Sequence, residues 1–376
     1  MALAAIHRTS LMSPADCQFN DDARRLITNL TAACIQHLRK ELQDPDDAQL
    51  GAQLATTRTL FLCEAISGSP TPRAWRTHFM GARALLTSSE RSGGKALSSQ
   101  RRDTSISFLK RWFNITEGLV ALTTEGLSGG QATGFGPRGV VSMKEGNQVC
   151  LDVYTGCTED LCVAFREIGA VAWEKRRAID HPERYPRLSE DDFLREADML
   201  ELSVRRMIER DRSRSTVLNV TGAHDISPEQ AEEFFLCNEA YQHTALIHVH
   251  RRIRGLPVHD PLVQESVRRI IECVSSIRPA ATLSPLTLLT TPLFAAGCAA
   301  LGTERIKIAQ ILTNMFALLR LPNMKRALEV LEAFWNDSEA REIDWDEFSR
   351  TCTSDYAVWN QVDDNIGQRD WDFLPY

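Results

Sequence analysis

Three histidines lie close together between positions 243 and 250, and such a group could bind a metal ion. His243 and His250 are two helical turns apart and would share one face of a helix, whereas His248 would point well away from them. A tetrahedral zinc site needs further nitrogen, sulfur or oxygen ligands. No acid or cysteine stands at the spacing that would complete the set, so we assign no metal ligands.

A second group with chemical potential is acidic. Asp191 and Asp192, followed by Glu196, superficially resemble the aspartate-rich magnesium motif of all-α terpene cyclases. Such enzymes also need an Asn-x3-Ser/Thr-x3-Glu motif on another helix, and the sequence contains none. Ser189 followed by acids is typical of a helix N-cap and first turn, where the helix dipole favours negative charge. A terpene-type enzyme stays as the remote enzyme-class alternative.

The segment 127–131, Leu-Ser-Gly-Gly-Gln, matches the signature motif of ABC-type ATPases. That motif works only opposite a Walker A loop, Gly-x4-Gly-Lys-Ser/Thr, which holds the phosphates. No such loop occurs, so we interpret the segment as a flexible glycine loop. No Ser–His–Asp or Cys–His arrangement stands out from spacing alone. We therefore assign no catalytic residue and no cofactor, and predict that the protein is not an enzyme.

The composition also restricts the function. The 376 residues carry a net charge of −7, and a protein that grips phosphate backbones is usually basic or carries a dense basic stripe. The longest weakly polar run, from Leu286 to Leu301, is interrupted by Pro292 and Gly297 and is too short to span a bilayer. We expect no direct nucleic-acid contact and no membrane segment.

The ten cysteines are scattered along the chain. Cys63 and Cys273 lie inside apolar helical patterns, which is typical of buried free thiols in a reducing compartment. No Cys-x2-Cys pair is present, and the separations of Cys150, Cys157 and Cys162 do not match a zinc module. The cysteines therefore predict neither a disulfide framework nor a zinc cluster.

Helix signals dominate the chain. Caps followed by apolar residues at helical spacing are predicted at Thr71–Pro72, Ser189, Ser227–Pro228, Asp260–Pro261, Thr303 after Gly302, and Asn323. Alternating apolar and polar residues are nearly absent, and the one strand candidate is residues 140–153. Two segments, 88–105 and 125–147, are rich in Ser and Gly and predict long loops. The expected fold is all-α, a multi-helix domain of packed antiparallel helices with two long Gly/Ser-rich loops.

Four segments in order resemble a known family. They are a leucine-rich helix with Trp75-x-x-His78-Phe79-x-Gly81-Ala82 (54–86), His-Thr-Ala-Leu-Ile-His-Val-His-Arg-Arg-Ile-Arg-Gly-Leu-Pro (243–257), the helix from Val263 to Ile277, and Pro-Leu-Phe-Ala-Ala-Gly-Cys (292–298) with a helix pair closing on Phe334–Trp335. Together they resemble the C-terminal regulatory domain of fungal zinc binuclear cluster transcription factors. The resemblance implies a transcription regulator in the nucleus, of the kind that controls metabolic or secondary-metabolite genes.

These family segments predict packing roles. Trp75, Phe79 and Ala82 would form one helical face, and Gly81 would let a neighbouring helix approach closely. The Trp335 ring would be buried with its N–H bonded to a partner. Family members usually begin with a six-cysteine zinc module that reads DNA, and this sequence departs from that pattern. Three explanations stay open: a natural regulator that acts through a partner, a truncated gene, and an engineered fragment. For the first we expect action through the transcription machinery or a DNA-binding partner protein, while a homodimer and a small-molecule effector stay open.

The C-terminal segment has an unusual composition. Residues 336–376 hold eleven acids and three arginines, interleaved with aromatic residues. This is the composition of an activation segment that folds onto coactivators; the alternative is a last helix (344–353) docked on the core, followed by an ordered tail. The expected division is a flexible N-terminus (1–20), the regulatory domain (21–340) and the acidic aromatic tail (341–376). A helical interaction scaffold without a transcriptional role is the alternative function.

Overall fold

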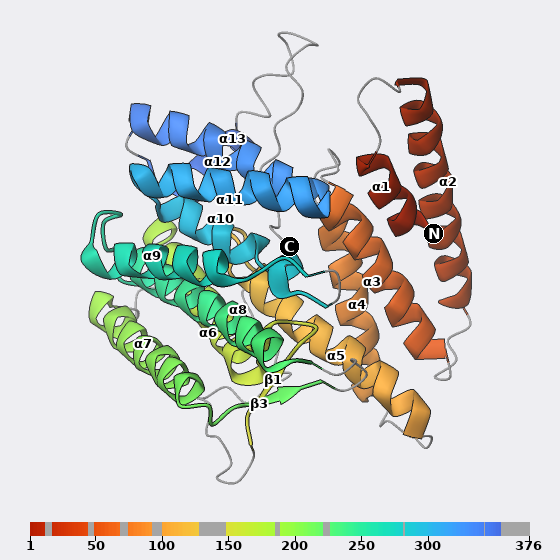
Figure 1. Ribbon diagram of the computed structural model, residues 1–376. Coiled ribbons are helices and arrows are strands. Elements are labelled where there is room, and N and C mark those ends of the chain that lie inside the picture. The colour runs from red at the N-terminus through yellow and green to blue at the C-terminus, as the bar shows by residue number, and fades with distance from the viewer. Residues whose placement is uncertain are drawn as a thin grey trace. The chain divides into compact units, whose positions relative to one another are not determined.

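The computed structural model is built almost entirely of helices (Figure 1). It describes residues 1–11, 17–43, 49–67, 74–91, 100–127, 148–184, 189–220, 226–280, 283–341 and 343–354. The expected all-α class is confirmed, with a small three-stranded sheet as the β-structure of the described residues. The chain divides into two compact units, residues 1–113, 313–330 and 347–376, and residues 114–312 and 331–346. The expectation of one regulatory body over 21–340 stays a prediction.

The N-terminal part of the first unit consists of α1 (Ala2–Ser10), α2 (Cys17–Glu41), α3 (Leu50–Ser67), α4 (Ala74–Arg91) and the first part of α5 (Gln100–Ala121). Its core is aromatic. The Phe61 ring packs edge-on against Trp75 and Trp112, with centroids 6.2 and 5.4 Å apart, and Phe79 stacks on Phe113 at 5.3 Å. Trp75, Phe79 and Ala82 are all buried, so the predicted helical face is confirmed.

Two expectations in this unit need correction. The segment predicted to be a flexible N-terminus contains α1, whose Ala2 and Ile6 are buried in a cluster with Cys63. The apolar residues of this short helix are spaced four apart, so they meet on one face and gain burial there. A β-carbon on Gly81 would lie 3.6 Å from Thr57, which is ordinary van der Waals contact. The helix approach at Gly81 is therefore not unusually close.

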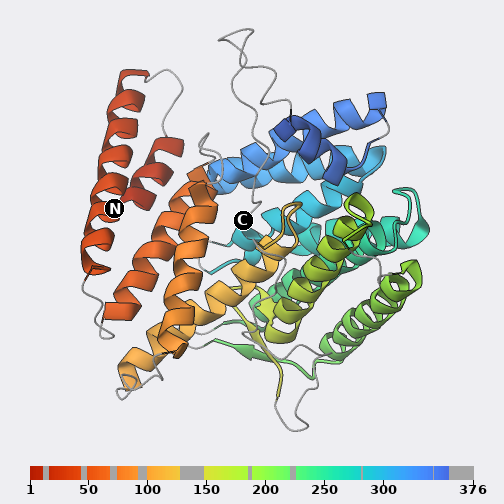
Figure 2. The same cartoon turned by 180° about the vertical axis from the view of Figure 1, so that it is seen from behind.

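The second unit surrounds one buried helix, α8 (Pro228–His248). Residues Cys237–Ile247 of α8 are all buried, so this part of the helix has no separate polar face turned to solvent. Helix α8 packs against α6 (Glu159–Asp180), α7 (Glu190–Arg212), α9 (Pro261–Ser276) and α10 (Thr290–Ala299). Figure 2 shows this unit from behind, where α6 and α7 lie side by side.

The small sheet lies beside α8. It consists of β1 (Cys150–Asp152), β2 (Cys157–Thr158) and β3 (Val217–Asn219), in the order β2-β1-β3. Strand β1 runs antiparallel to β2 and parallel to β3. Gly156 has φ +70° in the tight β1–β2 turn, and its amide donates to the Asp152 carbonyl at 2.8 Å. Three residues of the strand candidate 140–153 form strand β1. Residues 128–147 lie outside the described part of the chain.

The remaining elements are the π-helix Val249–Ile253, the 3-10 helix Pro285–Leu288, α11 (Thr303–Leu319), α12 (Pro322–Arg341) and α13 (Trp345–Ser354). In the second unit, a β-carbon on Gly297 of α10 would lie 2.5 Å from the Leu331 side chain of α12, so this glycine permits close packing. The Trp335 Nε1 donates to the Gly297 carbonyl at 2.9 Å, which confirms the expected partner for its N–H.

Three of the predicted helix caps are confirmed. Ser189 and Ser227 form capping boxes at α7 and α8, and the Asp260 side chain caps α9. The cap prediction for Thr303 is wrong, because α11 already includes this residue as its first position. The prediction for Asn323 is also wrong, because α12 begins at Pro322 and Asn323 lies in its first turn. Proline suits the first helical position, since its φ is already helical and its missing N–H is not needed there.

The predicted loops are only partly within the described residues. The first was expected over 88–105, but α4 continues to Arg91 and α5 begins at Gln100. Serine and glycine predict a loop there, but the charged residues on either side are good helix formers and extend both helices. The cap predicted at Thr71–Pro72, the middle of the first loop (92–99) and most of the second (128–147) lie outside the described residues.

Candidate functional site

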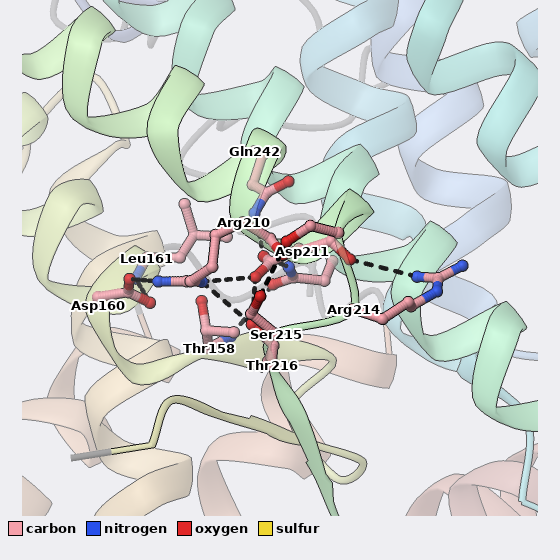
Figure 3. Close-up of polar contacts among 11 residues, drawn as sticks. Thr158, Asp160, Leu161, Arg210, Asp211, Arg214, Ser215, Thr216 and Gln242 are labelled. Carbon is pink, nitrogen blue, oxygen red and sulfur yellow. Dashed lines mark hydrogen bonds and ion pairs between the residues drawn. The ribbon is translucent and has the colours of Figure 1, made fainter. Parts of the chain in front are cut away.

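A polar cluster lies in the second unit where α7 ends (Figure 3). Its centre is Asp211, which is 5% exposed. The Asp211 Oδ2 accepts hydrogen bonds from Asn238 Nδ2 at 2.7 Å and from Gln242 Nε2 at 2.6 Å, both on α8. Its Oδ1 accepts from Arg210 Nε at 2.7 Å and from the Thr216 hydroxyl. The buried carboxylate is therefore fully hydrogen-bonded.

The same cluster extends to the start of α6. The Arg210 guanidinium pairs with Asp160, which is in the first turn of α6. The Thr158 amide donates to Asn238 Oδ1 at 3.1 Å. Burial alone would lower the pKa of Arg210, but hydrogen bonds to Asp211 and Asp160 raise it above its ordinary value. These contacts fasten α6, α7 and α8 together.

The end of α8 changes helical geometry. Residues Val249–Ile253 form a π-helix, in which the Arg254 amide donates to the Val249 carbonyl five residues earlier at 3.0 Å. Such turns are rare and frequently lie at functional sites. This one falls in the His-Val-His-Arg-Arg-Ile-Arg segment, and its basic side chains reach toward α7 and α13. We refer to residues 248–254 as the π-turn.

One side of the π-turn contacts α7. Arg254 Nη2 lies 2.6 Å from Asp198 Oδ1 and 2.8 Å from Glu201 Oε2, and His250 Nε2 lies 3.3 Å from Glu201 Oε2. Burial would raise the pKa of Glu201, but the hydrogen bond from Arg205 and the neighbouring positive charges lower it. Burial lowers the pKa of His250 despite the attraction of Glu201. The Glu201 carboxylate therefore lies among the positive charges of Arg254 and Arg205.

The other side of the π-turn holds the start of α13. Asp346 Oδ2 accepts from Arg252 Nε at 2.9 Å and from Arg176 Nη2 on α6 at 3.0 Å. Asp346 Oδ1 accepts from the Thr124 hydroxyl at 3.1 Å. Burial would raise the pKa of Asp346, but the charges of Arg252 and Arg176 lower it. Removing one partner of such a buried pair leaves the other charge uncompensated, which is costly.

An aromatic slot lies beside this ion pair. The Trp345 ring packs edge-on against Phe294 of α10, with centroids 5.0 Å apart, and against Phe334 of α12 at 5.6 Å. Phe294 and Phe334 are both buried. We call the slot and the guanidinium pair together the Trp–Asp receptor; it consists of Phe294, Phe334, Arg176 and Arg252. It binds two successive residues of α13 by complementary means, one apolar and one charged.

The three histidines considered as metal ligands have separate surroundings. His243 Nδ1 lies 3.4 Å from Ser266 Oγ on α9, and His250 faces Glu201 on α7. His248 lies among charges from Arg252 and Asp346. Within the described residues, no group of three or more His, Cys, Asp or Glu side chains is placed to hold a metal ion.

Acid should destabilise the protein through its buried histidines. Burial lowers the pKa of His243 to about 4 and that of His248 to about 3, below about 6.5 in an unfolded chain. As pH falls through 6.5, these histidines bind protons in the unfolded chain but stay neutral in the folded chain, so the free energy of unfolding decreases. We expect denaturant titrations to show a loss of about 2 kcal/mol per histidine between pH 7 and pH 5. The variant His243→Asn should lose less, and equal stability at both pH values would contradict the expectation.

The acidic motif at 191–196 proves to be the start of a helix. The Ser189 side chain accepts from the Asp192 amide at 3.2 Å, and Asp192 accepts in turn from the Ser189 amide at 3.0 Å. Hydrogen bonds from Ser189 lower the pKa of Asp192. The predicted cap is confirmed. The glycine motif at 127–131 lies outside the described residues after its buried first residue, Leu127.

The cysteines match the thiol prediction where they are described. All eight described side chains are free thiols, and Cys63, Cys157, Cys162, Cys237 and Cys273 are buried. Burial raises the pKa of Cys63 to about 11 and that of Cys162 to about 12. Thiols with raised pKa values are poor nucleophiles at neutral pH. Cys34 and Cys150 are exposed, which departs from the buried pattern.

Sequence reasoning did not find the two charged clusters. Asp211 and Gln242 are 31 positions apart, and Asp346 and Arg176 are 170 apart, so no local spacing marks them as partners. One indication was present in the sequence. Asn238, Gln242 and His243 interrupt the apolar face of a helix that is buried all round, and buried polar groups need partners. This pattern indicates a polar region in the core, but it does not identify the residues that contact these side chains.

The charged groups of these clusters belong to an all-α protein that uses them to join helices. Comparison of the sequence with known protein families identifies the family. Residues 1–374 match the fungal specific transcription factor domain. The chain therefore belongs to this family of transcription regulators. No curated protein and no solved structure gives a significant match. Among the described helices, none is both long and apolar enough to cross a membrane.

Proposed function

We propose that this chain regulates transcription in the nucleus through protein contacts, as an activator of a fungal metabolic or secondary-metabolite gene set. The observation that carries the proposal is the family match, which covers residues 1–374. The family supports the general role of a transcription regulator; the direction of regulation and the target genes are the proposed part. The acidic aromatic composition favours activation by the part of this segment, residues 336–376, that lies beyond α13. Within α13, Trp345 and Phe348 pack against the fold, as the alternative of a docked last helix expects.

The charged clusters support a structural role without catalysis. Asp211, Glu201 and Asp346 are each held by cationic or amide side chains from neighbouring helices. A general acid or base is instead tuned toward the working pH and faces a substrate. The pKa values of Glu201 and Asp346 are lowered, away from that range. These carboxylates are suited to holding helices in place.

DNA recognition is assigned to a partner protein in this proposal. The 376 residues contain no Cys-x2-Cys pair and carry a net charge of −7. A chain with this charge is repelled by phosphate backbones unless a basic surface faces them. The proposed partners are therefore a DNA-binding protein and the transcription machinery. The family resemblance leaves a homodimer and a small-molecule effector open.

Activation by the tail can be tested directly. Residues 336–376 are fused to a foreign DNA-binding domain and assayed on a reporter gene. We expect transcription several-fold above that of the DNA-binding domain alone, because acidic residues keep the aromatic side chains available to coactivators. The matched control replaces Trp359, Trp371 and Phe373 by alanine, which keeps the net charge and should remove most of the activity. A silent fusion at good expression would count heavily against an activation segment.

A helical interaction scaffold without a transcriptional role is the competing function. It predicts a tagged chain excluded from the nucleus and unchanged transcript levels after deletion of the gene. The proposal predicts nuclear accumulation and a defined set of transcripts that fall on deletion. Transcript profiling of the deletion strain separates the two, and it also shows which genes are controlled.

A further inference from the structure

The Trp–Asp receptor recognises two adjacent side chains of very different chemistry. Trp345 fills the slot between Phe294 and Phe334, while Asp346 pairs with two guanidinium groups. Edge-on aromatic pairs and charge-assisted hydrogen bonds both have defined geometry. The receptor is thus suited to a short Trp-Asp sequence rather than to acidic or apolar chains in general.

The chain contains a second sequence of this kind. Residues 344–346 read Asp-Trp-Asp and are followed closely by Phe348; residues 370–372 also read Asp-Trp-Asp and are followed by Phe373. The second copy lies outside the described residues. The two side chains that fill the slot and pair with the arginines in the first copy have equivalents in the second, since Trp371 corresponds to Trp345 and Asp372 to Asp346.

We propose that the Trp–Asp receptor is a docking site for Asp-Trp-Asp segments, and that residues 370–372 of the same chain are its second occupant. The two segments compete for one site, so binding of the tail segment displaces the start of α13. Charge complementarity supports the exchange, because the two arginines need an anion whichever copy is bound.

The length of the intervening chain permits this exchange. Asp372 is 18 positions beyond Ser354, the last residue of α13. An extended chain covers about 3.3–3.6 Å per residue, so this segment can span up to about 60 Å. A tethered segment also competes at an effective concentration in the millimolar range, which favours the chain's own copy over a foreign peptide.

The exchange would regulate the tail, and this consequence rests on the proposed function. Trp371 and Phe373 belong to the aromatic residues assigned to activation. With residues 370–372 in the receptor they are withdrawn from coactivators, whereas with α13 docked they are available. The receptor itself can be tested without any transcription readout, so failure of the activation proposal and failure of the docking proposal are distinguishable.

The test uses the full chain labelled with 5-fluorotryptophan and observed by ¹⁹F NMR. Single Trp→Phe variants assign the Trp345 and Trp371 signals, and a soluble paramagnetic agent reports their exposure. In Asp346→Asn the arginines lose their carboxylate, and we expect Trp371 to become protected from the agent. Arg176→Gln in the same background should restore its exposure, because Asp372 then loses a partner. Equal exposure of Trp371 in the wild type and in Asp346→Asn would overturn the proposal.

Two controls separate docking from loss of structure. Glu347→Gln neutralises an exposed carboxylate next to Asp346 and should leave Trp371 as exposed as in the wild type. The wild-type chain is also titrated with an unlabelled peptide of residues 365–376. The peptide should shift the Trp345 signal as it displaces α13. The same peptide with Asp372→Asn should need a concentration at least about tenfold higher to produce the same shift. An unchanged Trp345 signal at saturating peptide would contradict the proposal even if Asp346→Asn fails to fold.

Discussion

Replacing Asp211 with alanine is expected to lower the free energy of unfolding by about 3–5 kcal/mol. The carboxylate is buried and accepts from Asn238, Gln242, Arg210 and Thr216. Alanine would remove the Asp211 acceptor from Asn238, Gln242 and Thr216. It would also leave Arg210 with one carboxylate in place of two. Chemical denaturation followed by far-UV circular dichroism measures the change, which should appear as an earlier midpoint.

The matched control for this variant is Glu209→Ala, an exposed acid on the same helix. Exposed substitutions of this kind usually change stability by less than about 0.5 kcal/mol. Asp211→Asn should fall between the two, because an amide retains one acceptor oxygen but also brings an N–H₂ group toward the side-chain amides of α8. If the free energy of unfolding of Asp211→Ala lies within about 1 kcal/mol of that of Glu209→Ala, the cluster does not stabilise the fold.

The helix starts show how much of the fold could be predicted from local sequence. Ser189, Ser227 and Asp260 cap the helices that follow them, because capping depends only on the next three residues. The cap prediction for Asn323 was wrong for an equally local reason. The preceding Pro322 is suited to the first helical position, so the helix begins at that residue. Local cap signals therefore identified the starts of α7, α8 and α9, but they placed the starts of α11 and α12 one or two residues wrongly.

Contacts between distant segments could not be predicted in this way. The apolar pattern of α8 indicated a helix, but it did not show that all its faces are buried or that Asp211 lies against Asn238 and Gln242. The His-Val-His-Arg-Arg-Ile-Arg segment was recognised as part of the family resemblance, yet its π-helical turn has no local signature. The partners of Arg252 and Arg254 depend on tertiary packing, which sequence spacing does not encode.

Glycine illustrates the same limit. Gly81 was expected to permit a close helix approach, but the space around it is ordinary. The close approach is instead at Gly169 in the middle of α6, where a β-carbon would lie 2.3 Å from the Ala121 carbonyl oxygen at the end of α5. A single sequence contains both glycines, and nothing in their local neighbours distinguishes the tight one from the open one.

Gly169→Ala is accordingly expected to destabilise the second unit by about 3 kcal/mol, the upper end of the usual cost of overpacking. The added methyl group would meet the carbonyl oxygen, carbonyl carbon and β-carbon of Ala121, so rotation of a side chain cannot relieve the clash. Gly81→Ala is the matched control, because its new methyl group lies 3.6 Å from Thr57. Both substitutions gain up to about 1 kcal/mol of helix propensity, so the difference between their denaturation midpoints isolates the clash. Equal stability of the two variants would show that α5 and α6 can separate at little cost, and that Gly169 is not required for their close packing.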